Sequence, residues 1–376
     1  MDTLPVSIRL NPFKFRDIEG SSVPWNPLGR ILAERPVFTL DPLLHAGAYY
    51  VQDSSAMFVG HVFRNIEIFE GIRVLDLCAA PGGKTTDLAA SLRQAAGDNF
   101  LLVSNEVMRQ RASVLCDNVA LWGDPNVIVT SVDPAAFARL GGFFDVIVAD
   151  VPCSGEGMFR KDPRAREEWS PETVELCAAR QKRILADVWP ALKEGGYLLY
   201  STCTYNEREN DLNLKWAADE LGGIIAEPQR EYEEYGVRLT KYGHLLKAGE
   251  SLGEGQWAGL MRKTSAAERS AAESALDILH PLRKGVRKGQ MKGKDFIPDS
   301  DWALSLDFRL EDWPSADVDR ETALKYLHRD TILLPEAPKG YIVICYDGLP
   351  LGFVKNLGNR CNNLLPARRR ILMDIR

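Results

Sequence analysis

Two cysteines in comparable sequence contexts are the first candidates for chemistry in this chain. Cys153 follows Asp150-Val151-Pro152, and Cys203 lies in the run Ser201-Thr202-Cys203-Thr204. A thiolate is a strong nucleophile, and an acid beside it can stabilise charge that develops on a substrate. Two thiols and the Asp150 carboxyl group therefore suit covalent catalysis on a carbon that is itself a poor nucleophile.

One such carbon is C5 of a pyrimidine. Addition of a thiolate to C6 makes C5 behave like an enamine carbon, which can take a methyl group from a nucleoside cofactor. An acid must stabilise charge at N3, and a base must later remove the C5 proton so that the thiol can leave. Buried cysteine is also a common core residue, so a packing role stays open. The position of both cysteines just after strand-like segments favours catalysis for at least one.

A glycine-rich turn follows the apolar run from Val74 to Leu77 and reads Cys78-Ala79-Ala80-Pro81-Gly82-Gly83-Lys84. Proline and glycine end the strand and let the backbone approach a ligand. Thr85 or Thr86 can cap the next helix, whose first N–H groups face the turn. The spacing fits neither a P-loop nor the G-x-G-x-x-G of nicotinamide-dependent oxidoreductases. We interpret the turn as a nucleoside-cofactor cradle, although an ordinary strand-to-helix turn has a similar pattern.

Three acidic residues close the strands around this turn. Asp76 ends the first strand, where it suits a cationic or amino group. Glu106 ends the second strand, near the spacing from Gly82 at which an acid holds ribose hydroxyls. Asp133 follows the third strand and could accept from the exocyclic amine of adenine. A surface position for Glu106 and a capping or turn role for Asp133 are the alternatives.

Alternating strand and helix patterns from Gly71 onward must position these groups. The predicted strands are 73–77, 100–104, 127–130, 145–149, 197–200 and an antiparallel 255–263, and the predicted helices are 109–121 and 174–192. This alternation predicts a doubly wound α/β sheet, with Gly195-Gly196 ending the second helix. Ligands bind beyond the carboxyl ends of parallel strands, so both cysteines, Asp150 and the glycine turn should share one crevice.

The flanking segments are residues 1–70 and 264–376. The first has strand-like pieces between prolines, with aromatic clusters at 23–29 and 49–55 that can stack bases or pack internally. The second has a predicted linker helix at 264–274 and a loop at 283–294 with six cations and no acid. That loop could track phosphates or be a solvated charge run. A hairpin over 340–355 and the run Arg368-Arg369-Arg370 follow, so this appendage suggests delivery to RNA or DNA.

The overall composition limits the class of protein. The 376 residues carry a net charge of −6, with 45% hydrophobic and 26% charged residues, so any nucleic-acid binding must come from local patches. The sequence contains neither an apolar run of membrane-spanning length nor a signal pattern, which predicts a cytoplasmic protein. The cysteines form no C-x-x-C pair and the histidines no H-E-x-x-H, so we expect no metal site or disulfide framework.

These blocks together resemble the RsmB/RsmF (NOL1/NOP2/Sun) family of RNA cytosine-C5 methyltransferases, and within it the RsmF-like branch that modifies 16S ribosomal RNA. The resemblance covers most of residues 5–263 and extends more weakly to the C-terminus. It implies a Rossmann-like, S-adenosylmethionine-dependent methyltransferase domain at 71–263. It further implies an N-terminal RNA-recognition segment at 1–70, shorter than in relatives, and a linker with an α+β, PUA-like RNA-binding domain at 264–376.

The resemblance also implies roles for individual residues. Cys203 would be the nucleophile, Cys153 would help to release the product, and Asp150 would lie near the target base and the methionine end of the cofactor. Glu106 would bind the ribose and Asp133 the adenine. The residues that would cradle S-adenosylmethionine are Cys78, Ala79, Ala80, Pro81, Gly82, Gly83 and Lys84, although Lys84 could merely pair with a carboxylate.

Alternatives to this function differ in substrate or in class. The Thr-Cys motif distinguishes the family from DNA cytosine methyltransferases, which use the Pro-Cys thiol as nucleophile. Transfer RNA is an alternative substrate, and a non-catalytic RNA-binding factor for ribosome assembly is an alternative function that the presence of Cys203 disfavours. The expected partner is RNA, either 16S ribosomal RNA or the small ribosomal subunit, with no membrane, and no oligomer is implied.

Overall fold

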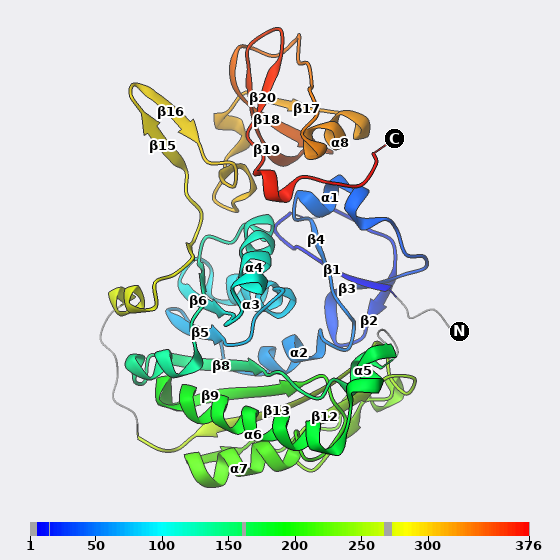
Figure 1. The fold of residues 1–376 in the computed structure, drawn as a ribbon, viewed down its shortest axis with the longest axis vertical. Helices are drawn as coiled ribbons and strands as arrows, with labels where there is room; N and C mark the ends of the chain where they lie inside the picture. Colours follow the sequence, from blue (N-terminus) through cyan, green and yellow to red (C-terminus); the bar gives the residue numbers. More distant parts are fainter. Residues whose placement is uncertain (1–5, 15, 160–162, 267–272, 376) are drawn as a thin grey trace.

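The computed structural model describes residues 6–14, 16–159, 163–266 and 273–375. Its centre is a sheet with the strand order β11-β12-β13-β9-β8-β5-β6-β7-β14, in which β10 also pairs with β13 (Figure 1). The five parallel strands are β5 (Ile72–Asp76), β6 (Phe100–Asn105), β7 (Val127–Thr130), β8 (Phe144–Asp150) and β9 (Leu192–Thr202). β13 (Gly255–Lys263) is antiparallel to β9. All six predicted strands are therefore confirmed, and the strand order reverses between β5 and β8.

Helices cover both faces of this sheet. One face carries α2 (Phe58–Arg64), α3 (Gly83–Ala96) and α4 (Arg109–Trp122), and the other carries α6 (Pro171–Val188), α7 (Asp211–Leu221) and the 3-10 helix η2 (Pro134–Leu140). Side chains alternate along a strand, so Val74 packs under the first layer and Leu75 under the second. The helix predicted at 109–121 is confirmed within one residue.

The helix predicted at 174–192 ends earlier than expected. α6 stops at Val188, a 3-10 turn covers Trp189–Ala191, and β9 already begins at Leu192. Gly195 and Gly196 therefore lie inside the strand and do not end the helix. A Cβ on Gly196 would come 2.7 Å from the backbone oxygen of Asp145, so the close approach of β8 requires glycine there.

The N-terminal residues form a separate antiparallel sheet beside the cofactor face. Its strands are β1 (Val6–Leu10), β2 (Ser21–Val23), β3 (Asn26–Leu32) and β4 (Tyr49–Val51), in the order β2-β3-β1-β4. Trp25 is buried, and its indole N–H donates to the Ser54 carbonyl at 2.7 Å, so it packs internally and is not available to stack a base. The buried Arg9 guanidinium donates to the Gly83 carbonyl at 3.1 Å, which joins this sheet to the glycine turn.

The C-terminal residues begin by extending the central sheet. β14 (Arg283–Lys284) pairs with β7, and β15 (Gly289–Lys292) with β16 (Asp295–Pro298) forms a hairpin. The prediction of a loop over 283–294 is therefore wrong. The predicted linker helix falls mostly on residues outside the described ranges. The hairpin predicted over 340–355 is confirmed as β18 (Gly340–Tyr346) and β19 (Leu349–Asn356).

The remaining elements complete the two flanking units and the sheet edge. They are α1 (Pro42–His45), α5 (Pro163–Glu168), β10 (Gly223–Ile225), β11 (Arg238–Leu239), β12 (His244–Lys247), β17 (Ser315–Asp317), α8 (Arg320–His328) and β20 (Cys361–Asn363). β17 to β20 and α8 form the small C-terminal unit at the top of Figure 1. Among the described helices, none combines the length and apolar character needed to span a bilayer.

Candidate active site

The carboxyl ends of β8 and β9 bring the two cysteines together. The loop after Asp150 carries Cys153, the loop after Thr202 carries Cys203, and the two sulfur atoms are 2.9 Å apart. Both thiols are free and partly exposed. The predicted convergence of the cysteines on one edge of the sheet is therefore observed.

Glu156 joins the two cysteine loops. Its carboxylate accepts from the Thr204 hydroxyl at 2.8 Å and from the Tyr205 N–H at 2.7 Å, and the Gly157 N–H donates to the Cys203 carbonyl at 2.8 Å. These bonds cross directly between the Pro-Cys and Thr-Cys segments. The spacing of the two sulfurs is thus fixed by hydrogen bonds and not by packing alone.

A second carboxylate, that of Glu209, also accepts hydrogen bonds from these loops. Glu209 is fully buried, and it accepts from the Ser154 N–H at 3.1 Å, from the Gln181 amide at 2.6 Å and from the Asn206 amide at 2.9 Å. A buried carboxylate is tolerated when several donors satisfy it. Sequence reasoning missed both glutamates. Glu156 lies three residues after Cys153, and this closeness to the Pro-Cys block was a signal that could have assigned it a role.

Asp150 is the centre of a third set of contacts. Its carboxylate accepts from the Ser201 hydroxyl at 2.7 Å and from the Gln256 amide at 3.0 Å, and it pairs with the Lys84 ammonium at 2.9 Å. The Gln256 amide nitrogen also donates to the Thr202 carbonyl at 2.9 Å. Sequence reasoning missed Gln256, which reaches the site from the antiparallel strand.

The pairing alternative for Lys84 is observed. Burial lowers the pKa of Lys84, but the neighbouring Asp150 carboxylate outweighs burial, so the pKa is raised and the ammonium form is retained. The pair links the glycine turn to the end of β8. The Lys84 ammonium thus lies beside Asp150, the acid that the sequence predicts near the target base.

The contact between the two sulfurs affects the protonation of Cys153. The hydrogen bond to Cys203, together with burial, raises the pKa of the Cys153 thiol well above its ordinary value. Cys153 therefore keeps its proton at neutral pH.

The glycine turn leads into α3 without a side-chain cap. Gly82 is the N-cap residue, with φ of 117°, a conformation that favours glycine. The prediction that a threonine caps this helix is wrong, because both hydroxyls are used elsewhere. Thr85 donates to the Asp76 carboxylate at 2.6 Å, and Thr86 donates to the Gly82 carbonyl at 2.9 Å.

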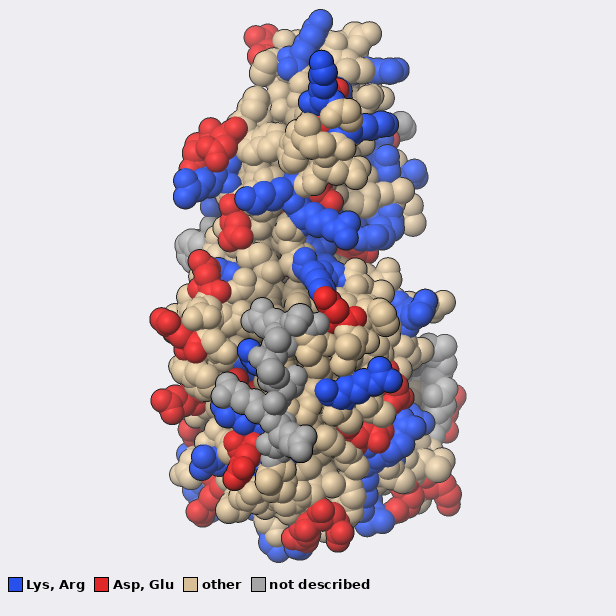
Figure 2. Space-filling view, turned by 90° about the vertical axis from the view of Figure 1, so that its left-hand side faces the viewer, with Lys and Arg blue, Asp and Glu red and all other residues tan. Residues whose placement is uncertain are grey.

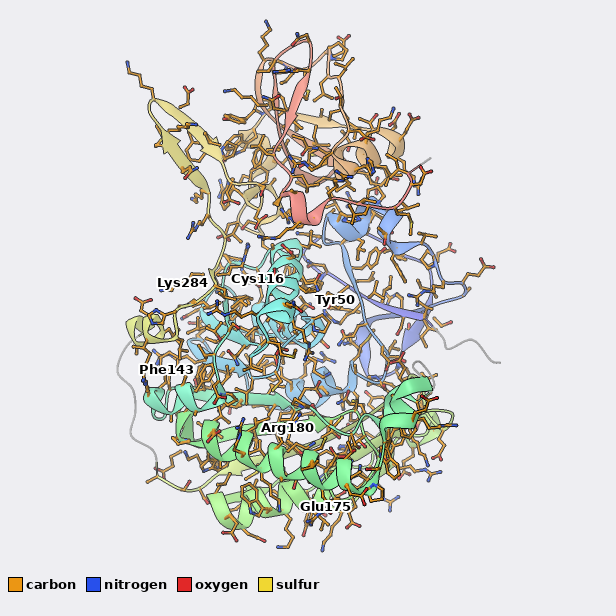
Figure 3. All side chains as sticks on the ribbon, in the orientation of Figure 1. Tyr50, Cys116, Phe143, Glu175, Arg180 and Lys284 are labelled. Carbon is orange, nitrogen blue, oxygen red and sulfur yellow. The ribbon has the colours of Figure 1, made fainter. Side chains whose placement is uncertain are left out.

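The rest of the turn is held by side chains around it. The Asn118 amide donates to the Pro81 carbonyl at 2.7 Å, and Arg111 donates to the Ala80 carbonyl at 2.8 Å. Tyr50 of the N-terminal sheet, labelled in Figure 3, also borders the turn: its hydroxyl accepts from the Asn118 amide at 3.4 Å, and a Cβ on Gly83 would come 3.3 Å from its ring. Ala79 is buried, and burial raises the pKa of Cys78, which lines the turn as a neutral thiol.

Asp76 is a buried acid with an unused oxygen. Its Oδ2 accepts from Thr85, whereas its Oδ1 has no hydrogen-bond partner. Burial raises the pKa of Asp76 to about 7. A buried, unpartnered carboxylate oxygen at the end of β5 suits a ligand that brings a cationic amino group.

The two other acids differ in exposure. Glu106 is only 3% exposed, so the surface alternative is wrong, and its carboxylate accepts from the Met108 N–H at 2.9 Å and pairs with Arg111 at 3.2 Å. The Asp133 side chain is 55% exposed and accepts from the Ala135 N–H at 3.1 Å, which is the predicted capping alternative. Both acids lie at the same edge of the sheet as the glycine turn.

The strand order, the glycine turn after the central strand and the paired cysteines define a Rossmann-like methyltransferase. Residues 65–221 match a family model described as 16S rRNA methyltransferase RsmB/F, and residues 314–371 match one described as the RsmF PUA domain. The ribosomal RNA small subunit methyltransferase F of Pectobacterium atrosepticum is 39% identical over 382 residues, which cover 85% of this chain and 77% of that protein. The chain belongs to the RsmB/RsmF family of 16S rRNA methyltransferases, and S-adenosylmethionine is the cofactor of this family.

Two further relatives show how far the likeness extends. The protein of the same name from Pectobacterium carotovorum is 42% identical over 173 residues, which cover 46% of this chain and 34% of that protein. A crystal structure of a methyltransferase homologue from Pyrococcus horikoshii has a TM-score of 0.58 and 25% identity, and the match covers 70% of this chain and 87% of that one.

The residues present fit S-adenosylmethionine. The uncapped start of α3 leaves backbone N–H groups facing the turn, and the free Oδ1 of Asp76 suits the amino group of the methionine moiety. Glu106 at the end of β6 suits the ribose. No cluster of metal-binding side chains occurs within the described ranges.

We predict that cofactor binding depends on pH through Asp76. Its pKa of about 7 means that it holds a proton below neutrality, and this proton must leave before an amino group can bind. The Kd for S-adenosylmethionine should therefore rise about tenfold between pH 8 and pH 6. Calorimetric titration of the wild type and of Asp76→Asn checks this: the variant should bind more weakly at pH 8 and show little pH dependence. An equally steep pH dependence in the variant would contradict the assignment.

Proposed function

We propose that this protein transfers a methyl group from S-adenosylmethionine to C5 of a cytidine in 16S ribosomal RNA. The observation that carries the proposal is the 2.9 Å approach of the Cys153 and Cys203 sulfurs beside the Asp150 carboxylate. The relatives named as small subunit methyltransferase F support the substrate. Because the substrate is ribosomal RNA, we also place the activity in the cytoplasm.

Cys203 is the nucleophile in this mechanism. Its thiolate forms a bond to C6 of the cytosine, and the displaced electron pair moves toward N3 and makes C5 nucleophilic. The Lys84 ammonium, 2.9 Å from the Asp150 carboxylate, supplies a proton that Asp150 passes to N3 as negative charge develops there. Bound S-adenosylmethionine supplies an electrophilic methyl group. Glu156 contributes indirectly, because it holds the Thr-Cys loop against the Pro-Cys loop.

Cys153 assists release of the product. After methyl transfer a base must remove the C5 proton, so that the C5–C6 double bond re-forms and the C6–S bond breaks. The hydrogen bond to Cys203 is the largest cause of the raised Cys153 pKa, and this bond is lost once Cys203 is attached to C6. Cys153 then releases its own proton to solvent more readily, and the resulting thiolate is placed to take the C5 proton. The departing electron pair returns to Cys203.

The non-catalytic alternative is disfavoured by the same geometry. A protein that only binds RNA has no need for two thiols at 2.9 Å, or for two carboxylates that hold their loops together. Burial of the Glu209 carboxylate costs desolvation free energy. This cost is understandable if the carboxylate must hold the two cysteine loops in place.

We predict that Cys203→Ala abolishes methyl transfer and leaves cofactor binding intact, because the thiol is needed for attack at C6 and not for the cradle. The enzyme is incubated with isotopically labelled S-adenosylmethionine and either 16S rRNA or, in a parallel reaction, transfer RNA, and each RNA is then digested for nucleoside mass spectrometry. The wild type should produce labelled 5-methylcytidine, and the variant at least about 10³-fold less. Label that appears in transfer RNA alone, or normal turnover by the variant, would overturn the proposal.

For Cys153→Ala we expect a covalent complex between protein and RNA to accumulate. Addition through Cys203 proceeds in this variant, but elimination is slow because the proton acceptor is missing. Denaturing gel electrophoresis should show a slowly migrating band that disappears after nuclease digestion. The double variant Cys153→Ala/Cys203→Ala is the control and should give no band. If Cys153→Ala also gives none while it turns over normally, Cys153 has no part in release.

A further inference from the structure

The hairpin formed by β15 and β16 projects away from the body of the molecule (Figure 1). Among the described residues it has only these two strands, and no third strand supports it. Met291 and Phe296 lie opposite each other in the register, with 64% and 39% of their surface exposed. Phe296 also lies beside Trp313, with ring centroids 6.4 Å apart, so one side of the hairpin contacts the segment before β17. A two-stranded hairpin with so little support is only marginally stable in water, and the exposed Met291 side chain next to Phe296 indicates a surface that another molecule covers.

The hairpin and the segment before it are strongly basic. Arg287, Lys292 and Lys294 are exposed, and no carboxylate within the described part of the chain forms an ion pair with them, unlike the nearby Lys284, which pairs with Asp277. Lys288 differs from these three because its ammonium lies over the Trp302 ring, 5.2 Å from the centroid. On a chain with a net charge of −6, such unpaired cations form a local anion-binding surface.

A groove of about 580 Å³ lies at the base of the hairpin, between β14 and α4. Cys116 on α4 and Lys284 on β14 line it and lie on the same side of the domain (Figure 3). Its lining contains more cations than carboxylates, namely Arg109, Arg283, Lys284, Arg287 and Arg368 against Asp299 and Asp301.

Ion pairs within the protein neutralise some of the cations that line the groove. Arg283 pairs with Asp301 at 2.8 Å, and Arg368 pairs with Asp117 at 2.7 Å. Arg109 and Arg287 have no such partner among the residues that the structure describes. The groove therefore keeps positive charge that no described carboxylate neutralises.

The groove reaches the start of α4, close in sequence to the end of β6. Arg109 is the first residue of α4 and follows closely after Glu106, which closes β6 beside the cofactor turn. At the other end, Arg283 pairs in register with Val129 of β7, so the base of the hairpin is anchored on the catalytic sheet. A polyanion lying in the groove would thus be held in a fixed position relative to the two cysteines.

We infer that this hairpin and groove bind the sugar–phosphate backbone of folded ribosomal RNA at a point remote from the target cytidine. The inference rests on the proposed function. Phosphates complement the unpaired cations, and Met291 with Phe296 offers an apolar contact for a sugar or base. Figure 2, which views this side, shows Lys and Arg side chains gathered over the upper part of the face, whereas both signs of charge mix lower down.

The test is a charge-reversal variant, Arg287→Glu/Lys292→Glu/Lys294→Glu. Lys288 is left unchanged because it packs on Trp302. The matched control is Lys215→Glu/Arg230→Glu/Lys241→Glu, which changes the net charge equally at exposed positions on and near α7. Binding of a 16S rRNA transcript is measured over a range of salt concentrations, and S-adenosylmethionine binding reports whether each variant is folded.

For the hairpin variant we expect the Kd for the transcript to rise about tenfold or more at roughly 150 mM salt, and the slope of log K against log salt to become shallower by about 2 to 3. Cofactor affinity should stay unchanged, and the control variant should keep most of the affinity of the wild type for RNA. An unchanged Kd and slope, or an equal loss in the control, would overturn the inference and indicate another occupant, such as an acidic protein. Methyl transfer by the wild type to the same transcript tests the proposed function separately.

Discussion

The Asp150 carboxylate joins the three segments on which the site depends. It pairs with Lys84 from the glycine turn, accepts from Ser201 at the end of β9 and accepts from Gln256 on β13. These segments are far apart in the sequence, and the partly buried ion pair is screened less than a surface pair would be. Loss of one partner would leave a charge without compensation. One acid, which the proposed mechanism also uses, therefore fixes the position of the cofactor turn relative to the cysteine loops.

The N-terminal sheet is attached to the same site by buried cations. Besides Gly83, the Arg9 guanidinium contacts the Gln52 side chain at 2.9 Å, and the Lys14 ammonium donates to the Leu121 carbonyl at 2.8 Å. Burial lowers the pKa of Lys14 to about 7. These contacts fasten the sheet to both α3 and α4, the helices that flank the cofactor turn. The position of the sheet is thus coupled to the conformation of the turn.

Sequence reasoning located the sheet well because its central strands are apolar runs that end at polar or turn residues. The meeting of Asp150, Cys153 and Cys203 follows from topology, since parallel strands place their carboxyl ends at one edge. Local patterns do not encode partners from distant segments, so Gln256 and Glu209 were missed. The prediction that a threonine caps α3 was wrong for the same reason, because the Thr85 hydroxyl donates to the Asp76 carboxylate instead.

The basic segment at 283–294 shows a second reason why sequence patterns fail to predict structure. Residues 283–294 have glycines and cations without apolar alternation, so a loop was the natural prediction. In the structure the backbone of Arg283 and Lys284 completes the edge of β7, and Met291 pairs with Phe296 across the hairpin. Backbone pairing at a sheet edge depends little on side-chain pattern.

The central claim is that Cys203, and not Cys153, attacks the base. The most direct measurement uses 16S rRNA that contains 5-fluorocytidine, whose fluorine cannot leave as the C5 proton does, so that the covalent adduct persists. Proteolysis and mass spectrometry then identify the cysteine that carries the nucleotide. We predict that the modified peptide contains Cys203. A nucleotide attached to Cys153 would reverse the assigned roles, and the absence of any adduct during active turnover would exclude the covalent route.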